Sequence, residues 1–329
     1  MAGPMPGKNI LVVGGAGFIG SNLVRRLLVE GHRPSVVDDL LTGARTNVPE
    51  DVPFTEASAA DADFIDRCGR ADWDAVFHLG GASSAPLFDD DPLRLTDAIA
   101  CFQNVLEVAR GADAPVAFAS TSSFYARCEK PYREDMHVVP STLYEASKLS
   151  MENLGRAYAA MYGVPVTAFR FFSVYGPHER AKGRYANIVS QFLWCLRGGI
   201  RPLLYGDGTQ TRDFTYVGDL VDGILGTYDR TEGFEVYNIG TGVEHTFLDV
   251  LDLLNRELGT DVEAASIPNP VRNYVQETLA DTGRLEATGW RARTSLEEGI
   301  RRLVREEAPP EPALIERMRE AHEAPLATV

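Results

Sequence analysis

A tyrosine and a lysine stand four positions apart, at Tyr144 and Lys148, near the start of a helical pattern over residues 143–162. Residues at this spacing project from one face of a helix, so the two side chains are expected to lie together. An ammonium group beside a phenol lowers the pKa of the phenol, and the phenolate can then act as a general base on a hydroxyl. Such pairs are also common on helix surfaces. Thr121, which follows an apolar run at 115–120, supplies a hydroxyl for the same substrate oxygen and favours a catalytic site.

A second chemical pattern is the glycine spacing of Gly14, Gly17 and Gly20, between an apolar run at 10–13 and an amphipathic run at 18–30. Strand, tight turn and helix in this order allow a backbone to approach a pyrophosphate and to point free N–H groups at it. Asp38, at the end of the next apolar run, is placed to bond a ribose hydroxyl. The pattern predicts dinucleotide binding. A carboxylate at position 38 favours NAD over NADP, because it would repel a 2′-phosphate.

Composition narrows the class of protein. The chain has 329 residues, is 44% hydrophobic and carries a net charge of −15, which argues against nucleic acid or an anionic membrane as a partner. No apolar run reaches the length of a membrane span, and the first strand-like run begins too early for a secretory signal. Its cysteines show no paired or metal-like spacing. We therefore expect a cytoplasmic protein with no metal site.

Strand-like and helical patterns alternate through the first half of the chain. Strands are predicted at 10–13, 34–37, 52–54, 75–79, 115–120 and 166–171, and helices at 18–30, 61–67, 93–110 and 143–162. This alternation predicts an α/β fold with a Rossmann-type, doubly wound parallel sheet. Ligands bind such sheets at the carboxyl ends of the strands, where Gly14, Asp38, Gly80, Thr121 and Ser173 stand.

After Gly176 the elements become shorter and the sequence richer in glycine, proline and arginine. Helices are predicted at 186–197, 217–228, 246–258 and 295–305, and strands at 202–205 and 235–239. We expect residues 1–176 to form the dinucleotide-binding domain, completed by segments around 206–245. Residues 177–329 are expected to form mainly a smaller α/β lobe that binds substrate. The tail from 306 is expected to be helical over 313–323, and no chemistry is assigned to it.

Several longer motifs carry a family resemblance. They are the runs at 14–20, 78–81, 120–125, 170–177 and 206–214, together with the Tyr144–Lys148 pair. With these the chain resembles an extended short-chain dehydrogenase/reductase of the NAD-dependent nucleotide-sugar epimerase/dehydratase family. The resemblance extends from about residue 8 to residue 305.

The resemblance implies an activity and a set of cofactor contacts. NAD would accept a hydride from the sugar and return it, while Tyr144 removes the hydroxyl proton and Lys148 holds the ribose. NAD would then behave as a prosthetic group, because no net oxidation occurs. Besides Tyr144 and Lys148, the cofactor contacts implied are Gly14, Gly17, Phe18, Ile19, Asp38, Asp39, Leu79, Gly80 and Phe171.

The residues after Thr121 distinguish the reactions of the family. Dehydratases resemble one another in carrying Asp-Glu there, whereas this chain has Ser122 and Ser123, which do not shuttle protons at neutral pH. Decarboxylating relatives usually have an acidic residue near position 123 and an arginine after Pro177, where this chain has His178. The pattern looks most like UDP-glucuronate 4-epimerases, although the two serines are also compatible with a loop in which small residues fill space.

By the same resemblance, the substrate contacts fall into two groups. Hydroxyls and an arginine would bind the sugar carboxylate, and further side chains would bind the diphosphate and uridine. The first group is Ser122, Ser123, Ser173 and Arg180, and the second is Asn187, Tyr205, Arg212 and Arg272. A homodimer formed through the helices at 93–110 and 143–162 is also implied.

Alternative functions remain open on the sequence alone. They are a 4-epimerase of UDP-glucose or UDP-N-acetylglucosamine, an epimerase of another nucleotide sugar such as a heptose or deoxysugar, and a non-catalytic NAD-binding sensor. The chain also departs from the family pattern near the adenine, where Ser58 stands in place of a common aspartate and Cys101-Phe102 in place of Gly-Thr. His78 follows a strand and is interpreted as structural.

Overall fold

A parallel sheet of seven strands forms the centre of the computed structural model, which describes residues 7–69, 71–269 and 275–326. The strand order is β11-β6-β5-β4-β1-β2-β3. The strands are β1 (Asn9–Val13), β2 (Arg33–Asp38), β3 (Phe54–Glu56), β4 (Ala75–His78), β5 (Val116–Thr121), β6 (Val166–Phe171) and β11 (Phe234–Ile239). All neighbouring pairs are parallel, so the carboxyl ends of the strands meet at one edge.

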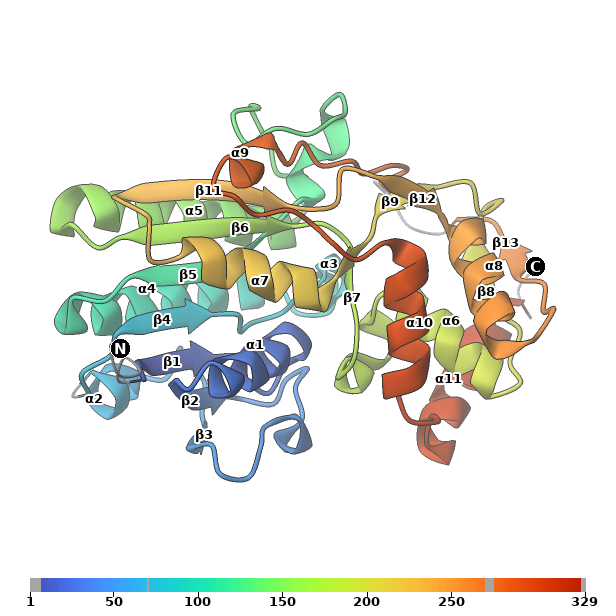
Figure 1. The fold of residues 1–329 in the computed structure, drawn as a ribbon, viewed down its shortest axis with the longest axis horizontal. Coiled ribbons are helices and arrows are strands. Elements are labelled where there is room, and N and C mark those ends of the chain that lie inside the picture. Colours follow the sequence, from blue (N-terminus) through green and yellow to red (C-terminus); the bar gives the residue numbers. More distant parts are fainter. Residues whose placement is uncertain (1–6, 70, 270–274, 327–329) are drawn as a thin grey trace, which may run out of the picture.

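Helices cover both faces of this sheet. Side chains along each strand alternate between the two faces, and apolar side chains on both faces pack against helices. In β1, Ile10 and Val12 pack toward α1 (Phe18–Val29) and α7 (Val217–Thr227). Leu11 and Val13 pack toward α2 (Phe64–Cys68), α4 (Arg94–Ala112) and α5 (Leu143–Tyr162). Figure 1 shows α1 and α7 in front of the sheet and α4 and α5 behind it. The predicted doubly wound α/β fold is confirmed.

The carboxyl ends of the strands point toward a second group of elements, on the right of Figure 1. Its helical segments are η3 (Arg180–Tyr185), α6 (Ile188–Arg197), α8 (Phe247–Leu258), α10 (Leu296–Glu306) and α11 (Pro312–Leu326). Its small sheets pair β7 (Val174–Tyr175) with β10 (Thr215–Tyr216), β9 (Thr211–Asp213) with β12 (Glu244–Thr246), and β8 (Leu203–Tyr205) with β13 (Ala265–Ile267). Phe192, Leu254 and Ile300 are buried in the core between these helices.

Local capping explains where the helices of both parts begin. Thr142, Asn187 and Ser295 each accept a backbone N–H of the first turn of α5, α6 and α10. Thr246 forms a full capping box with Asp249 at the start of α8. The predicted starts of these helices therefore lie within two residues of the observed ones.

Short elements account for the differences from the prediction. The third strand lies at Phe54–Glu56 rather than 52–54, and the helix expected at 61–67 begins at Phe64. Five short helical segments were not predicted: α3 (Ala85–Asp90), α9 (Gly283–Glu286), η1 (Arg45–Asn47), η2 (Ser123–Arg127) and η3. Segments of two to six residues are too short for a periodic pattern. Within the described ranges, no helix combines the length and the apolar character needed to span a bilayer.

Candidate active site

The glycine turn after β1 forms one wall of a pocket at the carboxyl ends of β1, β2 and β4. Gly14 has a φ of +82°, and a Cβ built there would lie 2.3 Å from the backbone nitrogen of Gly80. A Cβ on Gly20 would lie 2.1 Å from the carbonyl oxygen of Gly14. Only glycine fits these positions, and α1 begins directly behind the turn with its free N–H groups. The turn therefore fits a pyrophosphate.

Asp38 closes the side of this pocket at the end of β2. Its Oδ2 accepts the N–H of Ala16 at 2.9 Å, and its Oδ1 accepts the N–H of Leu40 at 2.8 Å. Burial raises the pKa of Asp38, and the backbone hydrogen bonds oppose that rise. A carboxylate has about four acceptor sites, so lone pairs remain for ribose hydroxyls. Asp39 lines the same pocket, and its carboxylate adds to the repulsion of a 2′-phosphate.

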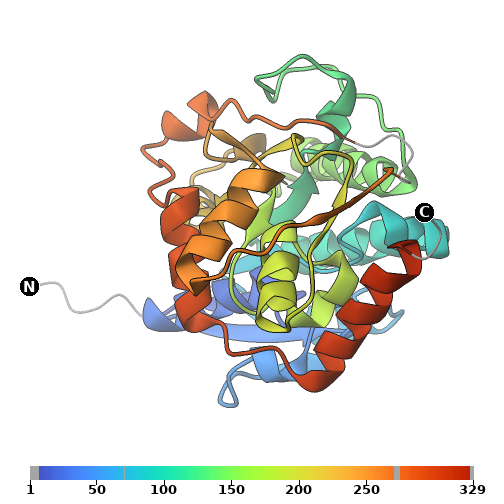
Figure 2. The ribbon, with the colours of Figure 1, turned by 90° about the vertical axis from the view of Figure 1, so that its right-hand side faces the viewer.

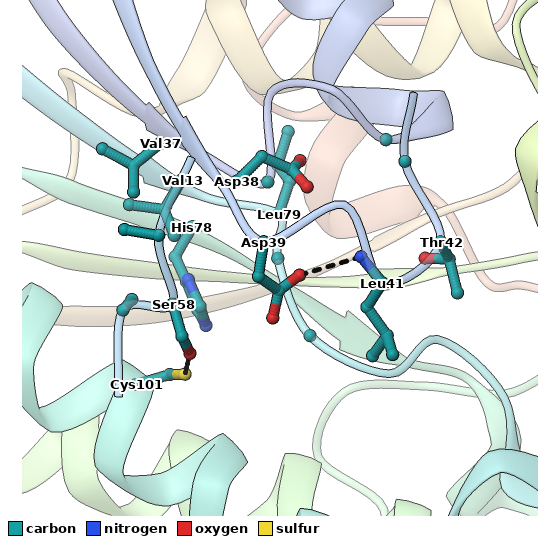
Figure 3. Close-up of a pocket in the computed structure, with 17 residues that line it drawn as sticks. Val13, Val37, Asp38, Asp39, Leu41, Thr42, Ser58, His78, Leu79 and Cys101 are labelled. Atoms are coloured by element: carbon teal, nitrogen blue, oxygen red, sulfur yellow. Dashed lines mark hydrogen bonds between the residues drawn. The ribbon is translucent and has the colours of Figure 1, made fainter. Parts of the chain in front are cut away.

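The far end of the pocket holds the two positions that depart from the family pattern. Figure 3 shows Ser58 and Cys101 meeting there, with the Ser58 oxygen 3.9 Å from the Cys101 sulfur. His78 lies nearby and stacks on Phe102 with ring centres 5.6 Å apart. Burial lowers the pKa of His78 to about 3, so this imidazole is neutral at physiological pH. These surroundings agree with a structural role for His78.

A larger cavity of about 470 Å³ adjoins this pocket, and Leu79, Gly80 and Gly81 line both. It lies between the carboxyl edge of the sheet and the η3–α6 segment. Each predicted cofactor residue lines the pocket, the larger cavity or both. Gly14, Gly17, Asp38, Asp39, Leu79 and Gly80 line the first, and Phe18, Ile19, Leu79, Gly80, Tyr144, Lys148 and Phe171 line the second.

Thr121, Tyr144 and Lys148 come together at the sheet side of the larger cavity. The Lys148 ammonium donates to the carbonyl of Ala119 at 2.9 Å and lies 6.0 Å from the centre of the Tyr144 ring. Burial lowers the pKa of Lys148 to about 8. Burial raises the pKa of Tyr144, and a hydrogen bond with Thr121 opposes that rise. The arrangement can move a proton to and from a substrate hydroxyl.

Hydroxyl groups surround this proton-transfer site. Thr121 donates to the hydroxyl of Ser123 at 3.0 Å and accepts the backbone N–H of Ser123 at 3.1 Å. Ser122 and Ser173 also line the cavity. Because hydroxyls both donate and accept hydrogen bonds, this rim suits the oxygens of a sugar or of a carboxylate.

Two of the residues predicted to bind the diphosphate and uridine line the same cavity, and both hold local structure as well. Asn187 donates to the carbonyl of Val174 at 3.1 Å and caps α6. Arg212 donates to the carbonyls of Thr211 and Val275 at 2.7 Å and 2.6 Å.

Two other predicted substrate residues do not line the cavity in this structure. Arg180 points to the opposite side of η3, where its Nε donates to Glu307 at 2.5 Å and its terminal nitrogen donates to the carbonyl of Ala308. Tyr205 lies on β8, where it is paired with Ile267 of β13. The prediction for Arg272 lies outside the described residues.

Lys182 is a cavity residue that the sequence reasoning missed. Its ammonium lies 2.8 Å from a carboxylate oxygen of Glu179 and 5.6 Å from the centre of the Phe18 ring. It is therefore a cation on the wall opposite Lys148. Residues 180–185 carry no periodic pattern, so no signal separated Lys182 from a surface lysine.

The family profile described as "NAD dependent epimerase/dehydratase family" matches residues 10–240. The chain belongs to this family. It is similar to the solved UDP-glucose 4-epimerase of Thermotoga maritima with UDP-glucose, with a TM-score of 0.86 and 32% identity over 90% of this chain and 97% of that one. It is also similar to MoeE5 in complex with UDP-glucuronic acid and NAD, with a TM-score of 0.79 and 30% identity over 95% and 99% of the two chains.

Decarboxylases are similar to this chain as well. UDP-glucuronic acid decarboxylase 1 of Danio rerio is 30% identical over 306 residues, which cover 90% of this chain and 72% of that protein. The comparisons confirm the predicted family, the isomerase class and NAD as the cofactor of this member of the epimerase/dehydratase family.

Proposed function

We propose that this enzyme is a UDP-glucuronate 4-epimerase that interconverts UDP-glucuronate and UDP-galacturonate. The observation that carries the proposal is the row of hydroxyls beside Tyr144, which consists of Thr121, Ser122, Ser123 and Ser173. A sugar carboxylate accepts several hydrogen bonds at once, and these hydroxyls can donate them.

Bound NAD supplies a hydride acceptor and donor at carbon 4 of the sugar. In the proposed reaction, Tyr144 takes the proton of the 4-hydroxyl as the hydride leaves carbon 4, which produces a 4-keto sugar. The sugar turns over within the cavity, and carbon 4 then receives the hydride on its other face while Tyr144 returns the proton. No atom is gained or lost, because the proton and the hydride both go back.

The neighbours of Tyr144 support this proton transfer. Thr121 shares a hydrogen bond with the phenol and is placed to hold the same substrate oxygen. When Lys148 is charged, it favours the phenolate electrostatically. From the family resemblance we also propose that Lys148 donates a hydrogen bond to the ribose of NAD.

In this proposal, the two parts of the chain bind different ligands. Residues 1–176, completed by segments around 206–245, would bind NAD, and residues 177–329 would mainly bind the UDP-sugar. Asn187 at the start of α6 and Arg212 on β9 line the cavity, and guanidinium groups suit phosphate oxygens. We propose a role in phosphate binding for Arg272 as well, from the sequence resemblance alone.

The side chains that follow Thr121 and Pro177 argue against the other reactions of the family. Elimination of water needs a general acid and a general base, and Ser122 and Ser123 are neither at neutral pH. Decarboxylating relatives usually carry an arginine where this chain has His178. His178 is half-buried, and burial lowers its pKa, so it does not replace the fixed positive charge of an arginine.

A second candidate, a 4-epimerase of neutral UDP-hexoses, is favoured by one observation. Arg180 is held by Glu307, so η3 does not present this guanidinium to a sugar carboxylate. The similarity to the UDP-glucose 4-epimerase of Thermotoga maritima is compatible with this alternative.

The two candidates are separated by incubating the purified protein with UDP-glucuronate and, separately, with UDP-glucose, without added NAD. We expect UDP-galacturonate to form faster than UDP-galactose. Deuterium placed on carbon 4 of the sugar should be retained in the product, because the hydride returns to the same carbon. Good conversion of UDP-glucose with none of UDP-glucuronate would remove the uronate proposal, and loss of the label to water would remove the epimerase mechanism.

A cytoplasmic homodimer is the remaining part of the proposal. Leu143 at the start of α5 and Met161 near its end are exposed, as is Leu93 at the start of α4. Exposed apolar side chains on two adjacent helices are compatible with a subunit interface. Sedimentation equilibrium should give twice the chain mass, and a monomer at micromolar concentration would contradict the dimer.

A further inference from the structure

The chain that follows α10 folds back against the η3–α6 segment. Glu307 is only 8% exposed and accepts a hydrogen bond from Arg180 at 2.5 Å. Arg180 also donates to the carbonyl of Ala308. From the last turn of α6, Arg197 donates to the carbonyls of Val304 and Glu307, each at 2.5 Å. Two arginines, one at each end of the η3–α6 segment, therefore hold the same stretch of backbone.

The helix α11 continues this contact. Its Leu314 and Met318 are buried together with Trp194 of α6 and with Ala186, which also lines the cavity. Figure 2 shows α11, in red, crossing the face of the second group of elements at the lower right. The C-terminal segment thus packs on the outer side of the cavity wall.

The inner side of that wall is the part that faces substrate. Lys182, Tyr185, Ala186 and Asn187 all line the larger cavity. Glu179 is almost fully buried and accepts hydrogen bonds from Lys182 and from the backbone N–H of Asn187, each at 2.8 Å. The wall is therefore held by one buried glutamate at its base and by Glu307 from outside.

The η3 segment depends on these anchors because it contributes no buried residue of its own. Gly183 breaks the helical backbone in its middle with a φ of +51°. The other arginine of η3, Arg184, forms an ion pair with Asp90, and both side chains are more than 60% exposed. It also donates a hydrogen bond to the hydroxyl of Tyr185, its neighbour in η3. Exposed pairs of this kind contribute little, whereas Glu307 is buried and its pair with Arg180 is partly shielded from water.

We propose that Arg180 and Glu307 are positioning residues for the UDP-sugar site. Their ion pair fixes η3 so that the cavity wall is formed before substrate enters. Neither residue touches the reacting atoms in this role, and the role is the same whichever UDP-sugar the enzyme prefers. In this proposal the segment that follows α10, for which no chemical role was predicted from the sequence, contributes to substrate binding.

The test is a double-mutant cycle on the full-length enzyme with Glu307→Gln, Arg180→Gln and both together. We expect each single variant to raise KM for the UDP-sugar about tenfold, because a charge-assisted hydrogen bond is lost. The kcat should stay within about twofold, because the wall is still formed once substrate is bound. The double variant should be no worse than either single one, since both changes remove the same interaction.

Glu298→Gln is the matched control, because Glu298 forms exposed ion pairs with Arg301 and Arg302 on α10. Its KM should match the wild-type value. Arg180→Lys is the second variant and keeps the charge while losing the contact with Ala308, so it should raise KM less than Arg180→Gln. Retained NAD, read from absorbance of the purified protein, should be the same in all variants.

Two results would overturn the proposal. If Arg180 bound substrate directly, Arg180→Gln would raise KM while Glu307→Gln would leave it unchanged or lower it, because the guanidinium would be released. If Glu307→Gln lowered kcat and NAD content together with raising KM, the pair would stabilise the whole protein rather than the wall. Both results differ from failure of the uronate proposal, which is judged only by which sugar is converted.

Discussion

The carboxylate of Glu152 accepts two hydrogen bonds from the guanidinium of Arg170, at 3.0 Å to Oε1 and 2.8 Å to Oε2, and both side chains are buried. Glu152 stands one turn after Lys148 on α5. Ser120, the neighbour of Thr121, donates to the same carboxylate at 2.6 Å. The pair therefore ties the helix that carries Tyr144 and Lys148 to the strands that end at the cavity.

Replacing Glu152 with glutamine is expected to lower the free energy of unfolding by about 3 kcal/mol, because the Arg170 charge would remain buried without its counter-charge. Urea unfolding at pH 7 measures this loss. Glu30→Gln is the control, because Glu30 pairs with Arg26 on the surface and should contribute less than about 1 kcal/mol. Equal losses in the two variants would show that the buried pair contributes no more than a surface pair.

Tyr144→Phe is expected to lower kcat by a factor of about 1000, because it removes the proton-transfer group. The ring packs against Phe88 with centres 5.7 Å apart, and phenylalanine keeps that contact, so the protein should stay folded. Conversion of UDP-sugar is followed by chromatography of the products. Tyr158→Phe is the control, because its hydroxyl contacts Glu107 far from the cavity. Unchanged turnover in Tyr144→Phe would favour the non-catalytic alternative.

Several of the predicted site residues lie together in the structure because of short-range geometry. The turn at Gly14 follows from the order of strand, glycine and helix within a dozen residues. Tyr144 and Lys148 share a face because they are one helical turn apart. Asp38 reaches the turn because β1 and β2 are adjacent in the sheet, with Val13 opposite Val37. In each case the local pattern and the order of parallel strands were sufficient.

The predicted residues that do not line the cavity have partners that are distant in sequence. Arg180 was expected to face substrate, and its actual partner, Glu307, is 127 residues away in a tail to which no chemistry had been assigned. Lys182 faces the cavity because Glu179 holds η3 at its base. A sequence shows that a residue is charged, but the direction of its side chain is decided by packing against segments that are distant in sequence, which no local spacing encodes.

The free energy of unfolding should depend on pH, because the Lys148 ammonium is buried in the folded protein. Burial lowers the pKa of Lys148 from 10.5 to about 8, so between these values the unfolded chain binds a proton that the folded protein has lost. Stability must therefore rise with pH in this window. We expect NAD-free wild type to gain about 1–2 kcal/mol relative to Lys148→Met between pH 7.5 and 9.5.

Urea unfolding of both proteins at the two pH values gives this difference, and the other titrating groups cancel in it. A difference that stays constant with pH would mean that the Lys148 ammonium is solvated or paired in the folded protein, and its proposed electrostatic effect on Tyr144 would then need another source.

Substrate preference should depend on Ser122. This side chain lines the cavity and is 9% exposed, and it is a cleaner target than Ser123, whose hydroxyl is a hydrogen-bond partner of Thr121. If Ser122 donates to a sugar carboxylate, Ser122→Ala should lower kcat/KM for UDP-glucuronate about tenfold and change that for UDP-glucose less than about twofold.

Ser150→Ala is the control, because the Ser150 hydroxyl donates a hydrogen bond to the carbonyl of Ala146 within α5. Equal losses with both sugars would mean that Ser122 supports the loop rather than the carboxylate, and the preference for a uronate would then have to come from cations such as Lys182 or Arg212.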